Sequence, residues 1–197
     1  MLLQLRAERM AAFSDGVIAV IITVMVLELK VPAHDLPDVE GLLKVLPLLV
    51  IYALSFVEVG IYWVNHHYMV DHVEQVSHGL LWANLGFLFT LSLIPFGTAW
   101  VGERGMTPFA LSFYSICCAL PAVSWIVLSI LVRHQTRVPF AGSPIKQAVS
   151  SALYVGVIPV SYHSLKSALV MLAAVAVLWV IPPKHVWEMT HAKSSDH

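Results

Sequence analysis

Four ionisable side chains lie within or beside apolar stretches of the chain: Arg9, Asp15, Glu28 and Glu58. A charge at the centre of a membrane-spanning helix costs at least about 2.5 kcal/mol. Each of these residues therefore needs a structural or functional explanation. Arg9 and Glu28 stand near the ends of the first apolar stretch, where an interface would solvate them. Asp15 and Glu58 lie deeper. We expect both to take part in function or in a polar network; the alternative is an acid that is protonated or locally paired in a helix contact.

Histidines and acids are dense between residues 66 and 78. His67, Asp71, Glu74 and His78 recur at helical spacing, so they would form one stripe along a helix. That stripe is too long to close around one ion, and we predict no metal site. A collar that titrates near the ordinary histidine pKa of about 6.5 is one interpretation, and a solvated helix end is the favoured one. The full set is His66, His67, Asp71, His72, Glu74 and His78.

Motifs for catalysis are lacking in the sequence. It contains no H-E-x-x-H, no G-x-S-x-G and no glycine-rich phosphate loop. The two cysteines, Cys117 and Cys118, are adjacent, which suits two buried apolar side chains better than a disulfide or a zinc site. We therefore predict no catalytic residue, no enzyme activity and no cofactor.

The composition is that of an integral membrane protein. Apolar residues make up 58% of the 197 residues and charged residues 12%, against about 45–50% and about 25% in soluble domains. The mean hydropathy is +0.79. The net charge of −1 offers no basic face to a phosphate backbone, so nucleic acid is excluded as a partner.

The apolar stretches predict an all-α fold with six transmembrane helices in one domain, residues 1–197. A helix crosses the hydrocarbon layer with about 20 residues. Four charge-free stretches provide four spans, and two further spans carry charges: the first contains Arg9, Asp15 and Glu28, and the second contains Glu58. The predicted helices cover residues 6–30, 43–66, 77–101, 107–132, 146–163 and 165–182, and residues 183–197 form a polar tail.

Lysine and arginine in the loops predict the orientation. If both termini are cytoplasmic, seven of these residues lie inside and four outside, which follows the positive-inside rule. We expect a multi-pass protein of the cell (plasma or inner) membrane, surrounded by lipid, with both termini in the cytoplasm.

One face of the first helix has a distinctive composition. At about 100° per residue its members fall within an arc of roughly 80°. By default such a face packs on another helix. If several copies surrounded an axis, it would instead line a pore, with Val20 and Leu27 as apolar rings that gate by dewetting and with Thr23 offering oxygen to a cation. The members of the face are Arg9, Phe13, Gly16, Val20, Thr23 and Leu27.

Residues 9–15 fit the pattern R-x-x-x-F-S-D at the start of the first helix. This pattern resembles the signature of the endosomal/lysosomal potassium channel family and its prokaryotic relatives. The resemblance continues to Val31-Pro32 and recurs at Trp63-Val64-Asn65-His66-His67, at Leu81-Trp82-Ala83-Asn84-Leu85 and at Pro95-Phe96. From about Met106 onward only the apolar spans agree.

The resemblance implies a six-helix subunit that assembles as a homotetramer, with the first helix lining a central pore. It places the constriction at Val20, Thr23 and Leu27. Val20 stands where a larger Leu or Ile is usual, so that ring would be wider. The resemblance also implies a polar network that holds the pore helix. Its members would be Arg9, Phe13, Ser14, Asp15, His66, His67 and Asn84.

Together these features predict a potassium-permeable cation channel whose barrier is a hydrophobic constriction on the first helix. Its partners would be further copies of itself, permeant monovalent cations and membrane lipid. The alternative is a proton- or ion-coupled secondary transporter that uses Asp15, Glu58 and the cluster from His66 to His78 as a relay. That reading has less support, because no internal repeat is visible.

Overall fold

The computed structural model describes residues 2–31, 37–73, 76–136 and 144–180, and the regular structure within these ranges is helical. Glu74 of the histidine-rich segment, residues 181–182 of the last predicted helix and the predicted tail 183–197 lie outside the described residues. The helices are α1 (Leu2–Val24), the 3₁₀ helix η1 (Met25–Glu28), α2 (Asp38–Val70), α3 (His78–Leu91), α4 (Leu93–Arg104), α5 (Pro108–Thr136), α6 (Pro144–His163) and α7 (Leu165–Val180).

Four helical stretches are long and apolar enough to cross a membrane: Ala7–Glu28, Asp38–Val70, His78–Arg104 and Pro108–Thr136. The predicted all-α membrane architecture is therefore confirmed. The two remaining predicted spans coincide with α6 and α7. The described part of α7 has 16 residues and extends about 24 Å, less than the roughly 30 Å of a hydrocarbon core. The count of six membrane spans stays a prediction.

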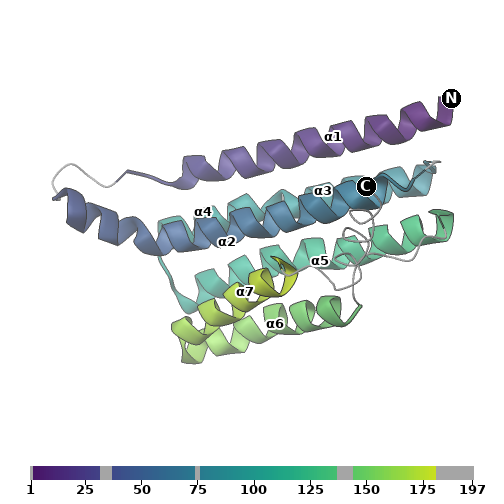
Figure 1. Cartoon of the computed structure of the whole chain (residues 1–197). Helices are drawn as coiled ribbons and strands as arrows, with labels where there is room; N and C mark the ends of the chain where they lie inside the picture. Colours follow the sequence, from purple (N-terminus) through teal and green to yellow (C-terminus); the bar gives the residue numbers. More distant parts are fainter. Residues whose placement is uncertain (1, 32–36, 74–75, 137–143, 181–197) are drawn as a thin grey trace, which may run out of the picture.

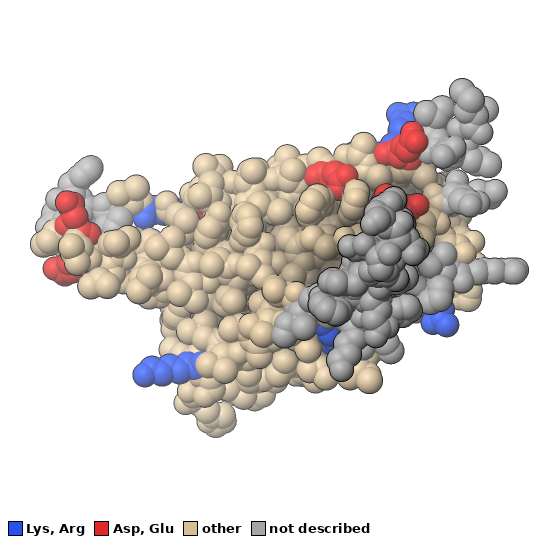
Figure 2. Space-filling view, in the orientation of Figure 1, with Lys and Arg blue, Asp and Glu red and all other residues tan. Residues whose placement is uncertain are grey.

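The helices run side by side as an elongated bundle (Figure 1). Helix α1 packs on α2 and α3, whereas α5 packs on α3, α4 and α6, and α6 packs on α7. This arrangement places α1 at one side of the bundle and the α6–α7 hairpin at the other (Figure 1). Figure 2 shows the Lys, Arg, Asp and Glu side chains mostly toward the two ends, with an extended uncharged surface between them, as expected of a chain surrounded by lipid.

The third predicted helix, residues 77–101, is present as two consecutive helices. Helix α3 begins after Ser77, whose side chain accepts a hydrogen bond from the Leu80 N–H at 3.2 Å. It ends at Leu91, and α4 begins at Leu93. Pro95 lies in the first turn of α4, where a backbone N–H has no partner within the helix. Because proline lacks that N–H, it cannot donate a hydrogen bond to the carbonyl of Leu91, and the helix breaks there.

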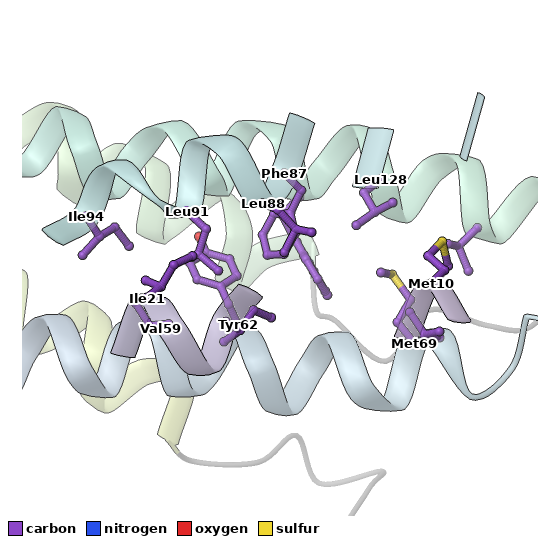
Figure 3. Close-up of a cluster of buried hydrophobic side chains, with 14 of the residues drawn as sticks. Met10, Ile21, Val59, Tyr62, Met69, Phe87, Leu88, Leu91, Ile94 and Leu128 are labelled. Atoms are coloured by element: carbon purple, nitrogen blue, oxygen red, sulfur yellow. The ribbon is translucent and has the colours of Figure 1, made fainter. Parts of the chain in front are cut away.

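Two apolar clusters hold the bundle together. The first joins α1, α2, α3, α4 and α5 (Figure 3). At its centre the rings of Tyr62, Phe87 and Trp125 lie with centroids 5.3–6.0 Å apart, a separation typical of favourable aromatic pairs. The second cluster joins α2, α4, α5, α6 and α7, with Tyr114 and Tyr154 among its buried members.

Buried hydroxyl groups link α2, α4 and α5 between these clusters. The Ser55 hydroxyl lies 2.7 Å from the Thr98 hydroxyl and 2.9 Å from the Tyr114 hydroxyl. Thr98 donates to the carbonyl of Ile94 in its own helix, and Ser55 also approaches the carbonyl of Ile51. All three hydroxyl side chains are buried, so their mutual hydrogen bonds replace contacts that water would otherwise make.

Replacing Ser55 with alanine should lower the free energy of unfolding by about 1–3 kcal/mol, because the buried hydroxyls of Tyr114 and Thr98 both lose their contact with Ser55. Thermal unfolding in detergent measures the loss. The matched control is Ser92→Ala, since Ser92 is exposed and bonds only to the Phe89 carbonyl of its own helix. Equal unfolding temperatures for the two variants would contradict this role of Ser55.

Candidate pore face and the contacts that hold it

Helix α1 has one covered and one uncovered face. Ser14, Ile18 and Ile21 are buried against the rest of the chain, with Ala7, Met10 and Met25 on the same side. The opposite face contains every residue of the predicted arc: Arg9, Phe13, Gly16, Val20, Thr23 and Leu27 are exposed. The exposed fraction is 59% for Val20 and 74% for Leu27. A single copy of the chain therefore leaves the predicted constriction without any packing partner.

Thr23 presents an oxygen atom on this face. Its hydroxyl lies 2.9 Å from the carbonyl oxygen of Ala19 and 3.0 Å from that of Val20. The hydroxyl hydrogen is thus donated back to the helix, which leaves the lone pairs of the oxygen directed outward. A hydroxyl held in this way can accept hydrogen bonds from water or coordinate a cation.

The end of the pore face differs from the prediction of one α-helix over residues 6–30. The α-helix stops at Val24, and Leu27 belongs to the 3₁₀ helix η1. Residues three apart align in a 3₁₀ helix, so Leu27 stands in line with Val24. Val24 is 40% exposed and had no part in the predicted constriction; a wheel drawn at 100° per residue places it about 60° from Leu27, just outside the predicted arc.

A contact at the end of η1 joins the first helix to α4. The ammonium group of Lys30 donates to Glu103 Oε1 at 2.7 Å. This hydrogen bond, together with the charge of Glu103, raises the pKa of Lys30 above its usual value. Both side chains are exposed, so the pair orients the segment after η1 more than it stabilises the fold.

A chain of buried polar contacts fixes the covered face of α1. The Asn84 amide group donates to Ser14 Oγ at 2.9 Å, and Ser14 donates to the Met10 carbonyl at 2.9 Å. His66 Nε2 lies 2.8 Å from Asn84 Oδ1. Because the amide oxygen only accepts, His66 Nε2 must carry the hydrogen. Helices α1, α2 and α3 are therefore joined through three side chains that are each at most 2% exposed.

The His66 ring is held by aromatic neighbours as well as by this hydrogen bond. It stacks on Phe87 with the ring centroids 5.8 Å apart and the planes 9° apart. The Trp125 ring lies 6.5 Å away. The imidazole thus has one polar contact, with Asn84, and apolar walls.

Asp15 has a different partner from its neighbour Ser14. The indole N–H of Trp63 donates to Asp15 Oδ1 at 3.0 Å. Trp63 is 43% exposed, so this contact lies at the edge of the α1–α2 interface. Sequence reasoning included Trp63 in a motif but gave it no role. The sequence did contain an indication of this role. Trp63 precedes His66 by three residues, so the two side chains lie on the same face of α2.

The remaining members of the predicted network form no hydrogen bond with these residues in the part of the chain that the structure describes, although the His67 ring lies 6.2 Å from that of Trp63. Arg9 and Phe13 are exposed on the uncovered face. His67 forms its contact with Asp71, at 3.6 Å between Nε2 and Oδ2, on the surface of α2. Within the described residues no three His, Cys, Asp or Glu side chains are grouped so as to hold a metal ion.

Substituting Asp15 should affect assembly or gating more than ion selectivity. Asp15→Ala removes the acceptor of the Trp63 indole and loosens one edge of the α1–α2 contact. We expect a smaller fraction of assembled protein, or an altered open probability, with an unchanged ratio of potassium to sodium currents. Bilayer recordings together with size-exclusion chromatography measure both quantities. Well-assembled Asp15→Ala channels with wild-type open probability would refute this prediction.

Glu58 lies away from the pore face, in the contact between α2 and α6. The hydroxyl of Tyr154 donates to Glu58 Oε1 at 2.5 Å. Trp63 follows Glu58 by five positions, which places the two side chains about 140° apart around α2. Asp15 and Glu58 therefore have separate surroundings, and the structure does not bring them together as a relay.

The chain is similar to known channel proteins over most of the elements described above. A family model described as the endosomal/lysosomal potassium channel TMEM175 matches residues 9–95. A potassium channel of Chryseobacterium sp. (strain P1-3) is 38% identical over 183 residues, which cover 90% of this chain and 94% of that protein. The human endosomal/lysosomal proton channel TMEM175 is 33% identical over 101 residues, or 45% of this chain and 19% of that protein.

A solved structure also matches. The crystal structure of a lysosomal potassium-selective channel TMEM175 homolog from Chamaesiphon minutus has a TM-score of 0.75 and 26% sequence identity, and the match covers 90% of this chain and 97% of that chain. The similarity thus extends beyond residues 9–95 into α5 and the helices that follow it.

Proposed function

The chain belongs to the family of the endosomal/lysosomal potassium channel TMEM175, and from this premise we propose how it conducts ions. It is a potassium-permeable channel and not an enzyme, and it needs no cofactor. The resemblance to this family is confirmed. The ion pathway is lined by the uncovered face of α1, and its barrier is a hydrophobic constriction formed by Val20, Thr23 and Leu27.

The observation that carries this proposal is the exposure of that face. Val20 and Leu27 are 59% and 74% exposed, although the opposite face of the same helix is buried and includes Ser14, which accepts a hydrogen bond from Asn84. Apolar rings exclude water from a narrow pore and so block ions until the pore widens. The Thr23 oxygen between them offers a passing cation one polar contact. The polar chain of Ser14, Asn84 and His66 positions the helix.

The pore requires more than one subunit. In one copy the face of α1 is open along its whole length, and an ion in the hydrocarbon layer must be enclosed on all sides. Copies arranged around an axis enclose it, and the family resemblance implies four. We propose a homotetramer, with Gly16 on the pore face permitting close approach of neighbouring copies.

The proposed location is the cell (plasma or inner) membrane with both termini in the cytoplasm. The distribution of lysine and arginine supports this orientation, with seven inside and four outside. In this orientation the Lys30–Glu103 pair lies at the outer end of the pore helix.

Recordings from planar bilayers that contain the purified protein test the proposed function. A channel gives discrete unitary potassium currents, because ions pass far faster than an alternating-access cycle turns over. The control is the same membrane with detergent alone. Potassium transport that occurs only with proton exchange and shows no unitary events would instead support the transporter alternative.

A further inference from the structure

A small cavity lies inside the subunit, between α2, α5, α6 and α7, and no residue that lines it comes from α1. Its volume is about 20 Å³, and a water molecule needs roughly 10–15 Å³. The cavity thus has room for one water molecule. Its polar lining is supplied by Glu58, Asn65, Gln147, Ser150, Ser151 and Tyr154.

Glu58 is the charged group of this cavity. Its side chain is 8% exposed, and its hydrogen bond from Tyr154 occupies one carboxylate oxygen. Across the described residues, the ion pairs of the chain are Lys30–Glu103, Lys44–Glu40 and His67–Asp71, and none includes Glu58. A carboxylate removed from water without a cation beside it is strongly disfavoured, so it takes up a proton instead.

Gln147 supplies a second, independent indication. Its Nε2 atom is buried and has no hydrogen-bond partner among the described residues, and Gln147 lines the same cavity as Glu58. The neighbouring Ser150 hydroxyl is engaged elsewhere: it donates to the Lys146 carbonyl and accepts from Trp179. A water molecule can accept from Gln147 and donate to Glu58, which satisfies both groups. A metal cation could not accept the amide hydrogen.

The titratable groups around Glu58 come from three helices. Tyr62 lies on α2, Tyr114 and Cys118 on α5, and Tyr154 on α6. The described part of α7 contributes Trp179, which does not titrate. The Lys146 ammonium lies 5.9 Å from the centroid of that ring and donates to the Leu178 carbonyl, and Lys146 is not among the residues that line the cavity. Within the described residues none of these groups forms an ion pair with Glu58.

We propose that Glu58 is a proton-binding site separate from the ion pathway, where the carboxylate takes up a proton through the water molecule in this cavity. A hydronium ion that reaches the cavity transfers its proton to a carboxylate oxygen and becomes water, and no other bond changes. The Tyr154 hydroxyl stays hydrogen-bonded to the carboxyl group in both forms. The proposal does not depend on where the pore lies.

Infrared difference spectroscopy of the protein in liposomes tests this site, because a protonated carboxylic acid has its own carbonyl band. Spectra are recorded through a series of pH steps for the wild type and for Glu58→Gln, which keeps the size of the side chain and the acceptor for Tyr154. The matched control is Glu103→Gln, since Glu103 is exposed on α4. We expect a pH-dependent band that is lost in Glu58→Gln and kept in Glu103→Gln.

A second variant keeps the test decisive if Glu58→Gln fails to fold. Tyr154→Phe removes the hydrogen bond to the carboxyl group, so the same band should remain and shift to higher frequency. Identical pH difference spectra for the wild type and Glu58→Gln would overturn the proposal. So would a Glu58 signal that follows the sodium or potassium concentration at constant pH, because the cavity would then hold a metal cation.

Discussion

Replacing Leu27 with alanine should increase the potassium current severalfold at a given voltage. Leu27 is 74% exposed on the uncovered face of α1 and stands at the end where the helix tightens into η1. Each copy would lose most of an isobutyl group from the proposed constriction, so water would fill the pore more readily. A reduction of the barrier by about 1.4 kcal/mol corresponds to a tenfold faster rate. Bilayer recordings of unitary current and open probability measure the effect.

The control for this prediction is Leu120→Ala. Leu120 is an exposed leucine on α5, so the same atoms are removed at a position away from the proposed pore. Its currents should match those of the wild type. If Leu27→Ala conducts like the wild type while Leu120→Ala conducts more, the constriction is not on α1.

Asn84→Leu should produce the largest loss of stability. The Asn84 amide joins Ser14 on α1 to His66 on α2, and leucine has a similar size but neither donor nor acceptor. The Nε2–H group of His66 would be left buried without an acceptor, at a cost of about 1–3 kcal/mol. Because Ser14 also loses its hydrogen bond from Asn84, α1 is held less firmly. Assembly should therefore fail as well. Thermal unfolding and the fraction of assembled protein in size-exclusion chromatography measure both effects.

Asn65→Leu is the matched control for this substitution. The Asn65 amide donates at 2.7 Å to the Ile61 carbonyl within its own helix, so its loss separates no elements. We expect a substantially smaller decrease in unfolding temperature than for Asn84→Leu. Equal decreases would mean that the contact between helices has no special importance.

The sequence predicted well which residues of α1 share one face, because that grouping depends only on helical periodicity. The arc that contains Val20 and Leu27 is the one the subunit leaves uncovered, and the positions one-third to one-half of a turn away are buried. Periodicity says nothing about the type of helix, however. The change to a 3₁₀ helix at Met25, and with it the alignment of Val24 with Leu27, therefore required the structure.

The pairing of the buried acids could not be predicted in the same way. Asp15 contacts Trp63, 48 residues later, and Glu58 contacts Tyr154, 96 residues later. No local pattern encodes contacts at such separations, since the packing of whole helices decides them. The sequence indicated that both acids have a structural or functional role, because an acid within a membrane-spanning helix is costly. It could not indicate that Asp15 lies in the contact between α1 and α2 and that Glu58 lines an internal cavity.

Chemical modification of a cysteine at position 23 tests the central claim most directly. In Thr23→Cys a charged methanethiosulfonate reagent should abolish the potassium current, because the modified side chain would project into the ion pathway. The native Cys117 and Cys118 are buried, so the wild type should be insensitive, as should Val155→Cys on α6. If mass spectrometry shows complete modification of Thr23→Cys while the current is unchanged, the uncovered face of α1 does not line the pore.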